Sequence, residues 1–362
     1  MKVLYVVPPT THFAGIEHVV HSVASGLAAQ YSEQFDVTVL YCGHYSEVSG
    51  ELPYKVIFED VPRLRQFPAR VGRWLSRARY DVVVIAQYEA TALVWMYHRL
   101  RGGRSRFVMH LHGNPKIESR GSLRARFAFV FFKYVALRMA KVLAVSPSLG
   151  RFLEQAVETP GLVEYVPNPV RQFDDVRPSK TDGPSVMFMS IGRLARQKGH
   201  DVLITAFAKL ATAGVDARLT IVGGGDEHDA LAALIARLGL GEHVQLLGTV
   251  PNPAAELAAA DCFVSASRWE GFGVAIVEAM SAGLYVIATD CEFGPSDVID
   301  SPEKGRIVPT DDPDRLAAAM IDFVRSDRGA AYGPLRREAA AAFRIDAVVS
   351  RHAAMLQSVG GR

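Results

Sequence analysis

Glu270 and Glu278 stand eight positions apart with two glycines between them. The mostly apolar residues 274–280 predict a buried helix, and residues 270–273 predict the turn that leads into it. Free amides and the positive end of the helix dipole at such a turn favour a bound anion such as diphosphate. Because carboxylates accept hydrogen bonds from hydroxyls, Glu270 could hold a sugar and Glu278, about two turns into the helix, a ribose. The alternative is two solvated glutamates beside a tight turn.

Residues 190–199 form a second segment with suitable chemistry, between an apolar run and a helical pattern. Open α/β sheets bind ligands at the carboxyl ends of their strands. Arg193 and Lys198 would bring a guanidinium fork and a point charge to a diphosphate there. Purely structural roles for both remain the alternative. The glycine-rich turn at 223–225 is weaker evidence of a site, because it does not satisfy G-x-G-x-x-G.

In the first half of the chain, Gly15 and Glu17 stand where an apolar run gives way to a helical pattern. Gly15 would let a phosphate or sugar approach a helix N-terminus, and Glu17 suits the helix dipole. His110 and His112 close another apolar run. We expect at most one of these histidines to face the ligand crevice, and no third clustered metal ligand is apparent. An ordinary hydrogen-bonded histidine at a strand end is the alternative.

These residues require a scaffold of strands and helices, and the sequence predicts one twice. Short apolar runs alternate with longer helical patterns along the chain, first at 3–7, 16–30, 37–40, 82–85 and 107–109 and again from residue 186 onward. Continuous apolar strands are buried on both faces, which predicts mainly parallel sheets covered by helices, the three-layer α/β class. We therefore expect an N-terminal domain at 1–170, a linker at 171–185, a C-terminal domain at 186–335 and a C-terminal helix at 336–362 that closes the second domain or reaches back to the first.

Size and composition agree with a globular protein of two cores. The chain has 362 residues, of which 49% are hydrophobic and 22% charged, whereas disordered chains are low in hydrophobic residues. Its three widely spaced cysteines argue against a disulfide framework and a zinc site, and fit a reducing cytosol. The first apolar run is too short for a signal peptide, and no segment approaches the ~20 apolar residues of a membrane span.

Positive charge is concentrated in residues 63–141, which hold 17 Lys and Arg against 3 Asp and Glu. Such a field attracts anionic partners, namely lipid headgroups, a lipid-linked phosphate or, last because no nucleic-acid-binding motif accompanies it, nucleic acid. A solvated arginine-rich surface is the alternative. We interpret the apolar segment 127–143 as a core-facing helix rather than a membrane anchor.

As a set, these segments resemble the retaining glycosyltransferases of the GT-B fold, specifically family 4 (group 1). The resemblance spans nearly the whole chain, and its motifs are Gly15-Ile16-Glu17, His112-Gly113, Val166-Pro167-Asn168-Pro169, Gly192-Arg193 through Lys198-Gly199, Val222-Gly223-Gly224-Gly225, Leu247-Gly248-Thr249-Val250, and Glu270-Gly271-Phe272-Gly273 through Glu278. It implies two Rossmann-like three-layer domains that face each other across a cleft, with the donor on the C-terminal domain and the acceptor on the N-terminal one.

The resemblance also implies a role for individual residues. Glu270, His112, Arg193 and Lys198 would be catalytic. The donor contacts would be Arg193, Lys198 and Gly15 on the diphosphate, Glu278 on the ribose, the backbone of Val250 on the base, His112 on the sugar, and Glu270 with the amides of Gly271, Phe272 and Gly273 on the hexose hydroxyls. Family members need no metal or other cofactor, because fixed cations offset the charge on the leaving nucleotide diphosphate.

Residues 290–297 are similar to the D-C-x-x-G-P-x-E segment of members that use UDP-hexoses or UDP-N-acetylhexosamines, with Asp297 in place of Glu. The resemblance thus implies transfer from a UDP-sugar, with an α-linkage, to a lipid-linked saccharide of a bacterial-type surface polysaccharide such as a lipopolysaccharide. We expect a cytoplasmic protein, peripheral on the inner face of the membrane through its basic N-terminal domain. The alternatives are a GT-B UDP-sugar epimerase, a phosphorylase, a transferase that uses GDP-mannose, or a non-catalytic sugar-nucleotide-binding module.

Overall fold

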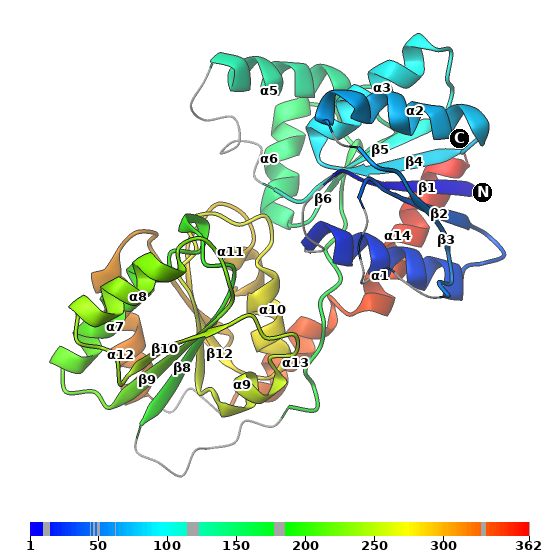
Figure 1. Cartoon of the computed structure of the whole chain (residues 1–362). Helices are drawn as coiled ribbons and strands as arrows, with labels where there is room; N and C mark the ends of the chain where they lie inside the picture. Colours follow the sequence, from blue (N-terminus) through cyan, green and yellow to red (C-terminus); the bar gives the residue numbers. More distant parts are fainter. Residues whose placement is uncertain are drawn as a thin grey trace. The chain divides into compact units, whose positions relative to one another are not determined.

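The chain forms two compact units, which we describe from a computed structural model (Figure 1). The structure describes residues 1–9, 15–43, 45, 48, 51–61, 63–113, 123–176, 185–326 and 331–361, without the side chains of 64 and 123–129. The N-terminal unit comprises Met1–Pro169 together with Ile345–Arg362, and the C-terminal unit comprises Val170–Arg344.

The N-terminal unit is built on a seven-stranded parallel sheet in the order β3-β2-β1-β4-β5-β6-β7. Its strands are β1 (Lys2–Val7), β2 (Asp36–Tyr41), β3 (Lys55–Phe58), β4 (Val82–Ala86), β5 (Arg106–Leu111), β6 (Lys141–Ala144) and β7 (Val163–Tyr165). Its helices include α1 (Gly15–Gln30), α2 (Phe67–Arg77), α3 (Tyr88–Leu100), α5 (Leu123–Ala136), α6 (Pro147–Val157) and α14 (Ile345–Gly360). Helices α1 and α14 cover one face of the sheet and α2 and α3 the other (Figure 1), so the central strands are buried on both faces.

The C-terminal unit repeats this plan with a six-stranded parallel sheet in the order β10-β9-β8-β11-β12-β13. Its strands are β8 (Val186–Ile191), β9 (Ala217–Val222), β10 (Val244–Gly248), β11 (Cys262–Ser265), β12 (Tyr285–Thr289) and β13 (Gly305–Val308). Its helices are α7 (His200–Thr212), α8 (His228–Arg237), α9 (Ala254–Ala259), α10 (Val274–Ser281), α11 (Pro295–Val298), α12 (Pro313–Arg325) and α13 (Gly333–Ala341), as far as the described residues extend. The two parallel-sheet, Rossmann-like domains that the apolar runs predicted are confirmed.

The boundaries between the units differ from those expected. The C-terminal segment is two helices rather than one, with α13 in the C-terminal unit and α14 in the N-terminal unit. Arg336 explains the position of α13, since its buried guanidinium donates to the carbonyls of Glu303 (2.8 Å) and Gly283 (2.9 Å). Residues 170–176 belong to the C-terminal unit, where the Phe173 amide donates to the Ser281 hydroxyl at 2.9 Å. The rest of the expected linker, 177–184, lies outside the described residues.

The segment 127–143 is less buried than we expected. Helix α5 ends at Ala136 and β6 begins at Lys141, so the segment is not one helix. Phe132 and Val135 are buried, but a second face of the helix is exposed, with Val130 at 65% and Tyr134 at 51%. The interpretation as a core-facing helix therefore holds for one face only. None of the described helices combines the length and hydrophobicity of a membrane span.

Candidate functional site

Loops from four neighbouring strands meet at the carboxyl edge of the C-terminal sheet. The loop that carries Arg193 follows β8 and is fastened to the glycine-rich turn after β9: the Gly192 amide donates to Val222 O at 2.9 Å, and the Leu194 amide to Gly224 O at 2.8 Å. A Cβ on Gly223, whose φ is 145°, would lie 2.0 Å from Gly192 O. Positions 223 and 225, where a Cβ would clash with backbone atoms of the neighbouring loop, therefore need glycine, and their close packing supports that loop.

Lys198 and Glu270 form the charged centre of this edge. The Lys198 ammonium lies 2.5 Å from Glu270 Oε1, and the Ser267 hydroxyl donates to the same oxygen at 2.7 Å. Gly199 allows the two loops to approach, because a Cβ there would lie 2.1 Å from Ala266 O. Arg193 is exposed and has no side-chain partner in the described part of the chain. The Lys198–Glu270 pair is neutral as a whole, so Arg193 supplies an uncompensated positive charge at this edge.

The turn before α10 presents backbone donors, as its sequence predicted. Gly273 precedes the helix with a φ of 89°, and the amides of residues 271–273 donate to no acceptor within the described ranges. Phe272 is 3% exposed and packs 5.1 Å from the Phe343 ring, so its side chain anchors the turn while its amide stays available. This arrangement can accept an anionic or hydroxyl-bearing ligand.

Glu278 lies in α10, and its position differs slightly from the expectation. It is the fifth residue of the helix, about one turn rather than two from its start. Burial raises the pKa of Glu278 to about 7, although Arg171 opposes the shift. This carboxyl group can thus donate or accept a hydrogen bond near neutral pH. Val250 is half-buried and follows β10 at the same edge of the sheet.

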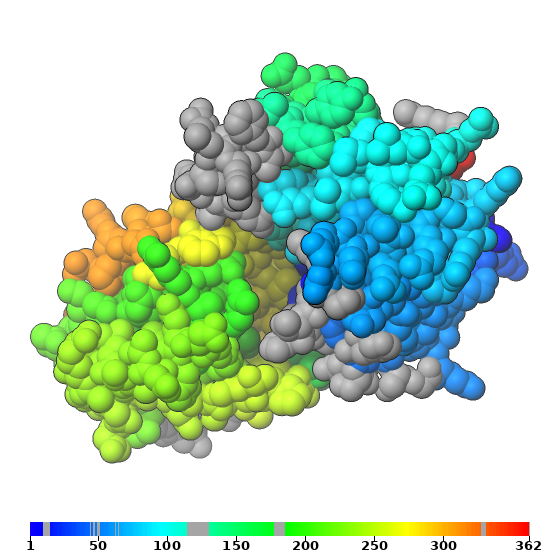
Figure 2. Space-filling view, turned by 45° about the horizontal axis from the view of Figure 1, so that its top comes forward, coloured from blue at the N-terminus to red at the C-terminus, as the bar shows by residue number. Residues whose placement is uncertain are grey.

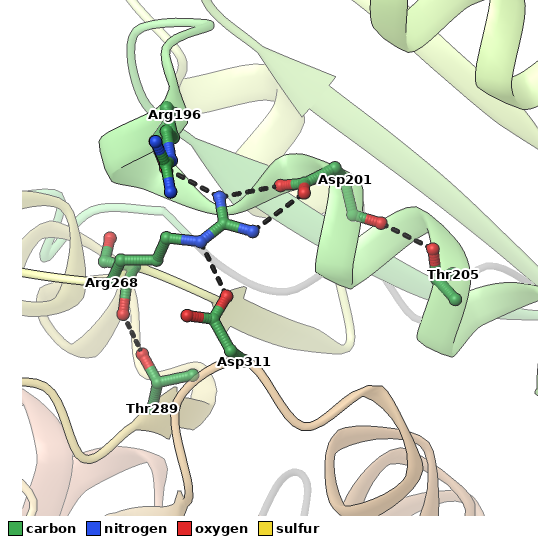
Figure 3. A network of polar contacts seen from close by, with 7 residues as sticks. Arg196, Asp201, Thr205, Arg268, Thr289 and Asp311 are labelled. Atoms are coloured by element: carbon green, nitrogen blue, oxygen red, sulfur yellow. Dashed lines mark hydrogen bonds and ion pairs between the residues drawn. The ribbon is translucent and has the colours of Figure 1, made fainter.

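An arginine that our sequence interpretation gave no role ties these loops together (Figure 3). Arg268 donates to both carboxylate oxygens of Asp201 at 2.9 and 2.7 Å, to Asp311 at 2.6 Å, and to the carbonyl of Arg196 at 2.8 Å. Although burial opposes it, the Arg268 guanidinium lowers the pKa of Asp201. The Arg268–Asp201 pair thus holds the loop of Lys198 beside the loop of Glu270. No local spacing signals a contact between residues so far apart in sequence.

In the N-terminal unit, Gly15 begins α1, and a Cβ there would meet no described atom within 4 Å. Glu17, which follows in the first turn, is 2% exposed. No contact with a described atom therefore requires glycine at this position. The loop before it, including Ala14, lies outside the described residues.

His110 and His112 lie side by side, whereas we expected them to point to opposite faces so that at most one could face the crevice. Their ring centroids are 4.0 Å apart, because residues two apart lie on the same face of a strand. His352 from α14 adds a third ring, 5.5 Å from His110. Burial lowers the pKa of His112 to about 4, opposed by a hydrogen bond with Asn168. His112 is thus neutral at pH 7, and its buried Nε2 has no partner among the described atoms.

The described part of the chain contains no group of three or more His, Cys, Asp or Glu that could hold a metal ion. Arg193, Lys198, residues 270–273, Glu278 and Val250 all belong to the C-terminal unit, whereas Gly15 and His112 belong to the N-terminal unit. Each unit therefore carries its own part of the predicted set at the carboxyl ends of its strands.

Comparisons with known proteins identify the family. Two family models match, "Glycosyltransferase Family 4" over residues 13–171 and "Glycosyl transferases group 1" over residues 172–342. The phosphatidyl-myo-inositol mannosyltransferase of Mycolicibacterium smegmatis is 30% identical over 280 residues, 74% of this chain and 69% of that protein. The N-acetylgalactosamine-N,N'-diacetylbacillosaminyl-diphospho-undecaprenol 4-alpha-N-acetylgalactosaminyltransferase of Campylobacter jejuni is 34% identical over 140 residues, 39% of this chain and 38% of that protein.

The matched segments cover only 50% and 38% of the lengths of two curated relatives. Among solved structures, Anabaena Alr3699/HepE in complex with UDP superposes with a TM-score of 0.81 at 20% identity, over 99% of this chain and 100% of that one. This likeness extends the two-domain architecture over the whole length. The chain belongs to the GT-B glycosyltransferases of group 1, family 4.

Proposed function

We propose that the protein is a retaining glycosyltransferase that transfers a hexose or N-acetylhexosamine from a UDP-sugar to a lipid-linked saccharide, with an α-linkage, in the synthesis of a bacterial-type surface polysaccharide. The observation that carries the proposal is the grouping of the exposed Arg193, the Lys198–Glu270 pair and the free amides of residues 271–273 at one sheet edge of the C-terminal unit. Its family membership and the UDP bound by the Anabaena relative support it.

The proposed chemistry is electrostatic. Arg193 and Lys198 would stabilise the negative charge that develops on the UDP leaving group, without a metal. Glu270 and the amides beside it would hold the hexose hydroxyls, and Glu278 the ribose. His112 is neutral at pH 7, which suits a hydrogen bond to a sugar better than an interaction with phosphate charge. Attack on the face from which UDP departs would retain the anomeric configuration.

The acceptor is proposed to be lipid-linked because two named relatives act on a diphospho-undecaprenol and on a phosphatidyl-inositol. The N-terminal unit has a surface that fits an anionic membrane. We call the exposed side chains of Leu93, Met96, Leu100, Val130, Phe131, Tyr134 and Leu137 the α3–α5 patch. Cations lie on the same helices and just beyond their ends, including Arg101, Lys133 and Arg138. Figure 2 shows this part of the chain, coloured cyan to teal, at the surface.

Exposed apolar residues bordered by cations are typical of proteins that lie on a membrane surface. Part of the expected basic stretch is not free: Arg70 pairs with Glu59 at 2.8 Å. Arg120 and the side chains of Arg124 and Arg126 lie outside the described residues. The α3–α5 patch thus assigns the proposed membrane contact to particular helices, which the positive charge of residues 63–141 alone did not do.

A GDP-mannose donor is the second candidate, because the relative that matches over 74% of this chain is a mannosyltransferase. The test is to incubate the purified protein with UDP-glucose, UDP-galactose, their N-acetylated forms or GDP-mannose, with and without a polyprenyl-diphosphate-linked saccharide. Transfer that requires both substrates and gives an α-linked product by NMR supports the proposal. Donor conversion without acceptor would instead identify an epimerase, and dependence on orthophosphate a phosphorylase.

A further inference from the structure

A cavity of the N-terminal unit lies at the amino edge of its sheet. It measures 1160 Å³ and is lined at the starts of four strands by Met1, Phe35, Asp81 and Arg106, with the end of α14 on one side. Figure 1 shows both chain termini at this edge. His112 and Gly15 lie at the opposite edge, about 16–20 Å away across strands of five or six residues. The cavity is thus separate from the candidate site above.

The lining of this cavity has an excess of positive charge. Among the described residues, the arginines Arg79, Arg101, Arg104 and Arg106 line it together with one carboxylate. That carboxylate, Asp81, already accepts the Lys2 amide at 2.7 Å. Arg106 donates to Val359 O near the end of α14, where a positive charge suits the helix dipole, and Arg99 donates to Gly103 O in the loop after α3.

Two of the four arginines remain unused. Arg101 lies over the Tyr97 ring at 4.7 Å, and Arg106 is engaged by α14. Arg79 and Arg104 are exposed, and neither has a hydrogen bond or ion pair in the part of the chain that the structure describes. They therefore give the cavity two guanidinium groups that are free for a ligand.

Contacts with His98 hold the loop that carries Arg104 in place. Its Ser105 amide donates to Nε2 of the buried His98 at 3.4 Å, and Gly103 lies so close to the His98 ring that a Cβ would be 2.1 Å from it. Gly102, with a φ of 76°, begins the loop. A loop fixed in this way presents its arginine without a large ordering cost on binding.

We propose that this cavity binds a phosphate-bearing ligand through Arg79 and Arg104. Guanidinium groups match phosphate oxygens with two parallel hydrogen bonds each, and the side chain of Ser105 adds an uncharged donor from the lining. The volume exceeds a single phosphate group, so it accommodates more of the ligand. The phosphate is either part of a soluble diphosphate compound or the headgroup of a phospholipid. The proposal rests on the N-terminal unit alone and does not depend on the transfer reaction.

The test compares two charge-matched double variants of the whole chain, Arg79→Gln/Arg104→Gln and Arg73→Gln/Arg77→Gln. Arg73 and Arg77 are exposed on α2 but do not line the cavity. Both variants also carry Arg193→Gln, which weakens anion binding by the C-terminal unit. Inorganic pyrophosphate is titrated by calorimetry at low salt. We expect the dissociation constant for pyrophosphate to rise about tenfold or more for each arginine removed in the Arg79→Gln/Arg104→Gln variant. It should stay unchanged in the Arg73→Gln/Arg77→Gln control.

A second arm separates the two sources of phosphate. Flotation with phosphatidylcholine vesicles, with and without phosphatidic acid, tests the headgroup. If the protein binds phosphatidic acid vesicles but not pyrophosphate, and only the cavity variant loses this binding, the ligand is a lipid. If it binds pyrophosphate but not the vesicles, and only the cavity variant loses this binding, the ligand is a soluble compound. The proposal is overturned if neither probe binds, or if both double variants lose binding equally. Circular dichroism and melting temperature verify that each variant is folded.

Discussion

Arg268 and Asp201, 67 positions apart, form a two-pronged ion pair in which each Nη atom donates to a different carboxylate oxygen, at 2.9 and 2.7 Å. The same guanidinium reaches Asp311 and the carbonyl of Arg196 (Figure 3). Lys198 and Glu270 lie two residues beyond Arg196 and Arg268, respectively. The distance between the two charged donor-site residues is therefore set in part by a pair that need not touch the ligand.

Arg268→Lys should lower turnover of the donor sugar about tenfold or more, because an ammonium cannot make the planar, two-pronged contact. The loss should appear mainly in kcat, and the melting temperature should fall by only a few degrees, since Asp201 is 46% exposed. Steady-state kinetics and calorimetry measure both. Lys209→Ala is the matched control: Lys209 lies on α7 like Asp201, and the change breaks its exposed pair with Asp314 of α12 and should leave kcat unchanged. Equal kcat in wild type and Arg268→Lys would remove the positioning role.

Lys198→Ala and Glu270→Gln should each reduce transfer about a hundredfold or more, because both alter groups that would act on the departing diphosphate or the hexose. Lys198→Ala also leaves the Glu270 carboxylate, 7% exposed, with only the Ser267 hydroxyl as a partner, so its melting temperature should fall. Lys304→Ala, which breaks an exposed pair with Asp300, is the control. Full activity of both Lys198→Ala and Glu270→Gln counts against the proposed donor site.

Glu278 should make donor binding dependent on pH near neutrality. Its carboxyl has a folded pKa raised to about 7 by burial, so it is protonated in the folded state and ionised in the unfolded chain between pH 4.5 and 7. Its contribution to stability is therefore lost as pH rises through this range. Above pH 7 the ionised group accepts ribose hydroxyls better, and UDP affinity should rise. Calorimetric titrations from pH 6 to 8 measure this, and Glu278→Gln should flatten the curve. A slope that persists in Glu278→Gln would assign the titration elsewhere.

The buried histidines of the N-terminal unit should destabilise it in acid. Burial lowers the pKa of His112 to about 4 and of His352 to about 3, and lowers that of His110 as well. Below pH 6.5 the unfolded chain binds protons that the folded unit does not, so stability falls with pH by about 1.4 kcal/mol per unit for each histidine. Hydrogen exchange of α14 amides between pH 7 and 5 should report this loss.

His352→Gln should reduce the acid sensitivity of α14 by the share of one histidine. Amides of α12, in the C-terminal unit, serve as the internal comparison, because that unit contains none of these three histidines. It does contain the buried His200, whose pKa burial lowers to about 4, so α12 should lose protection by about the amount that one histidine contributes, in wild type and variant alike. If His352→Gln leaves the acid sensitivity of α14 unchanged, or reduces that of α12 equally, the histidine cluster is not the cause.

Phe131→Ser/Leu137→Ser should weaken sedimentation with anionic liposomes several-fold, since it removes two side chains of the α3–α5 patch, 39% and 51% exposed. Leu238→Ser, at an exposed leucine of the C-terminal unit, is the control and should sediment like wild type. Added salt should weaken binding through the cationic part only. A wild-type protein that does not sediment at low salt would contradict the membrane proposal.

The two parallel α/β domains and the turn that leads into α10 were predictable from the sequence, because both depend on local patterns. Apolar runs such as 82–86 can be satisfied only between two helical layers, and the glycines at 271 and 273 indicate a turn before a helix, where Gly273 has a φ of 89°. The positions of Arg193, Lys198 and Glu270 followed from their place after strands, since the carboxyl ends of parallel strands share an edge.

The partners of these residues were decided only by the tertiary structure. The order of strands brings Asp201 to Arg268 and the C-terminal helix α14 to His110, and nothing in the local sequence encodes a contact across so many residues. The same holds for α13, which the buried Arg336 fixes to the C-terminal unit although its composition suits either unit. Periodicity specifies which face of an element is buried, whereas the choice of neighbour depends on how the elements pack together.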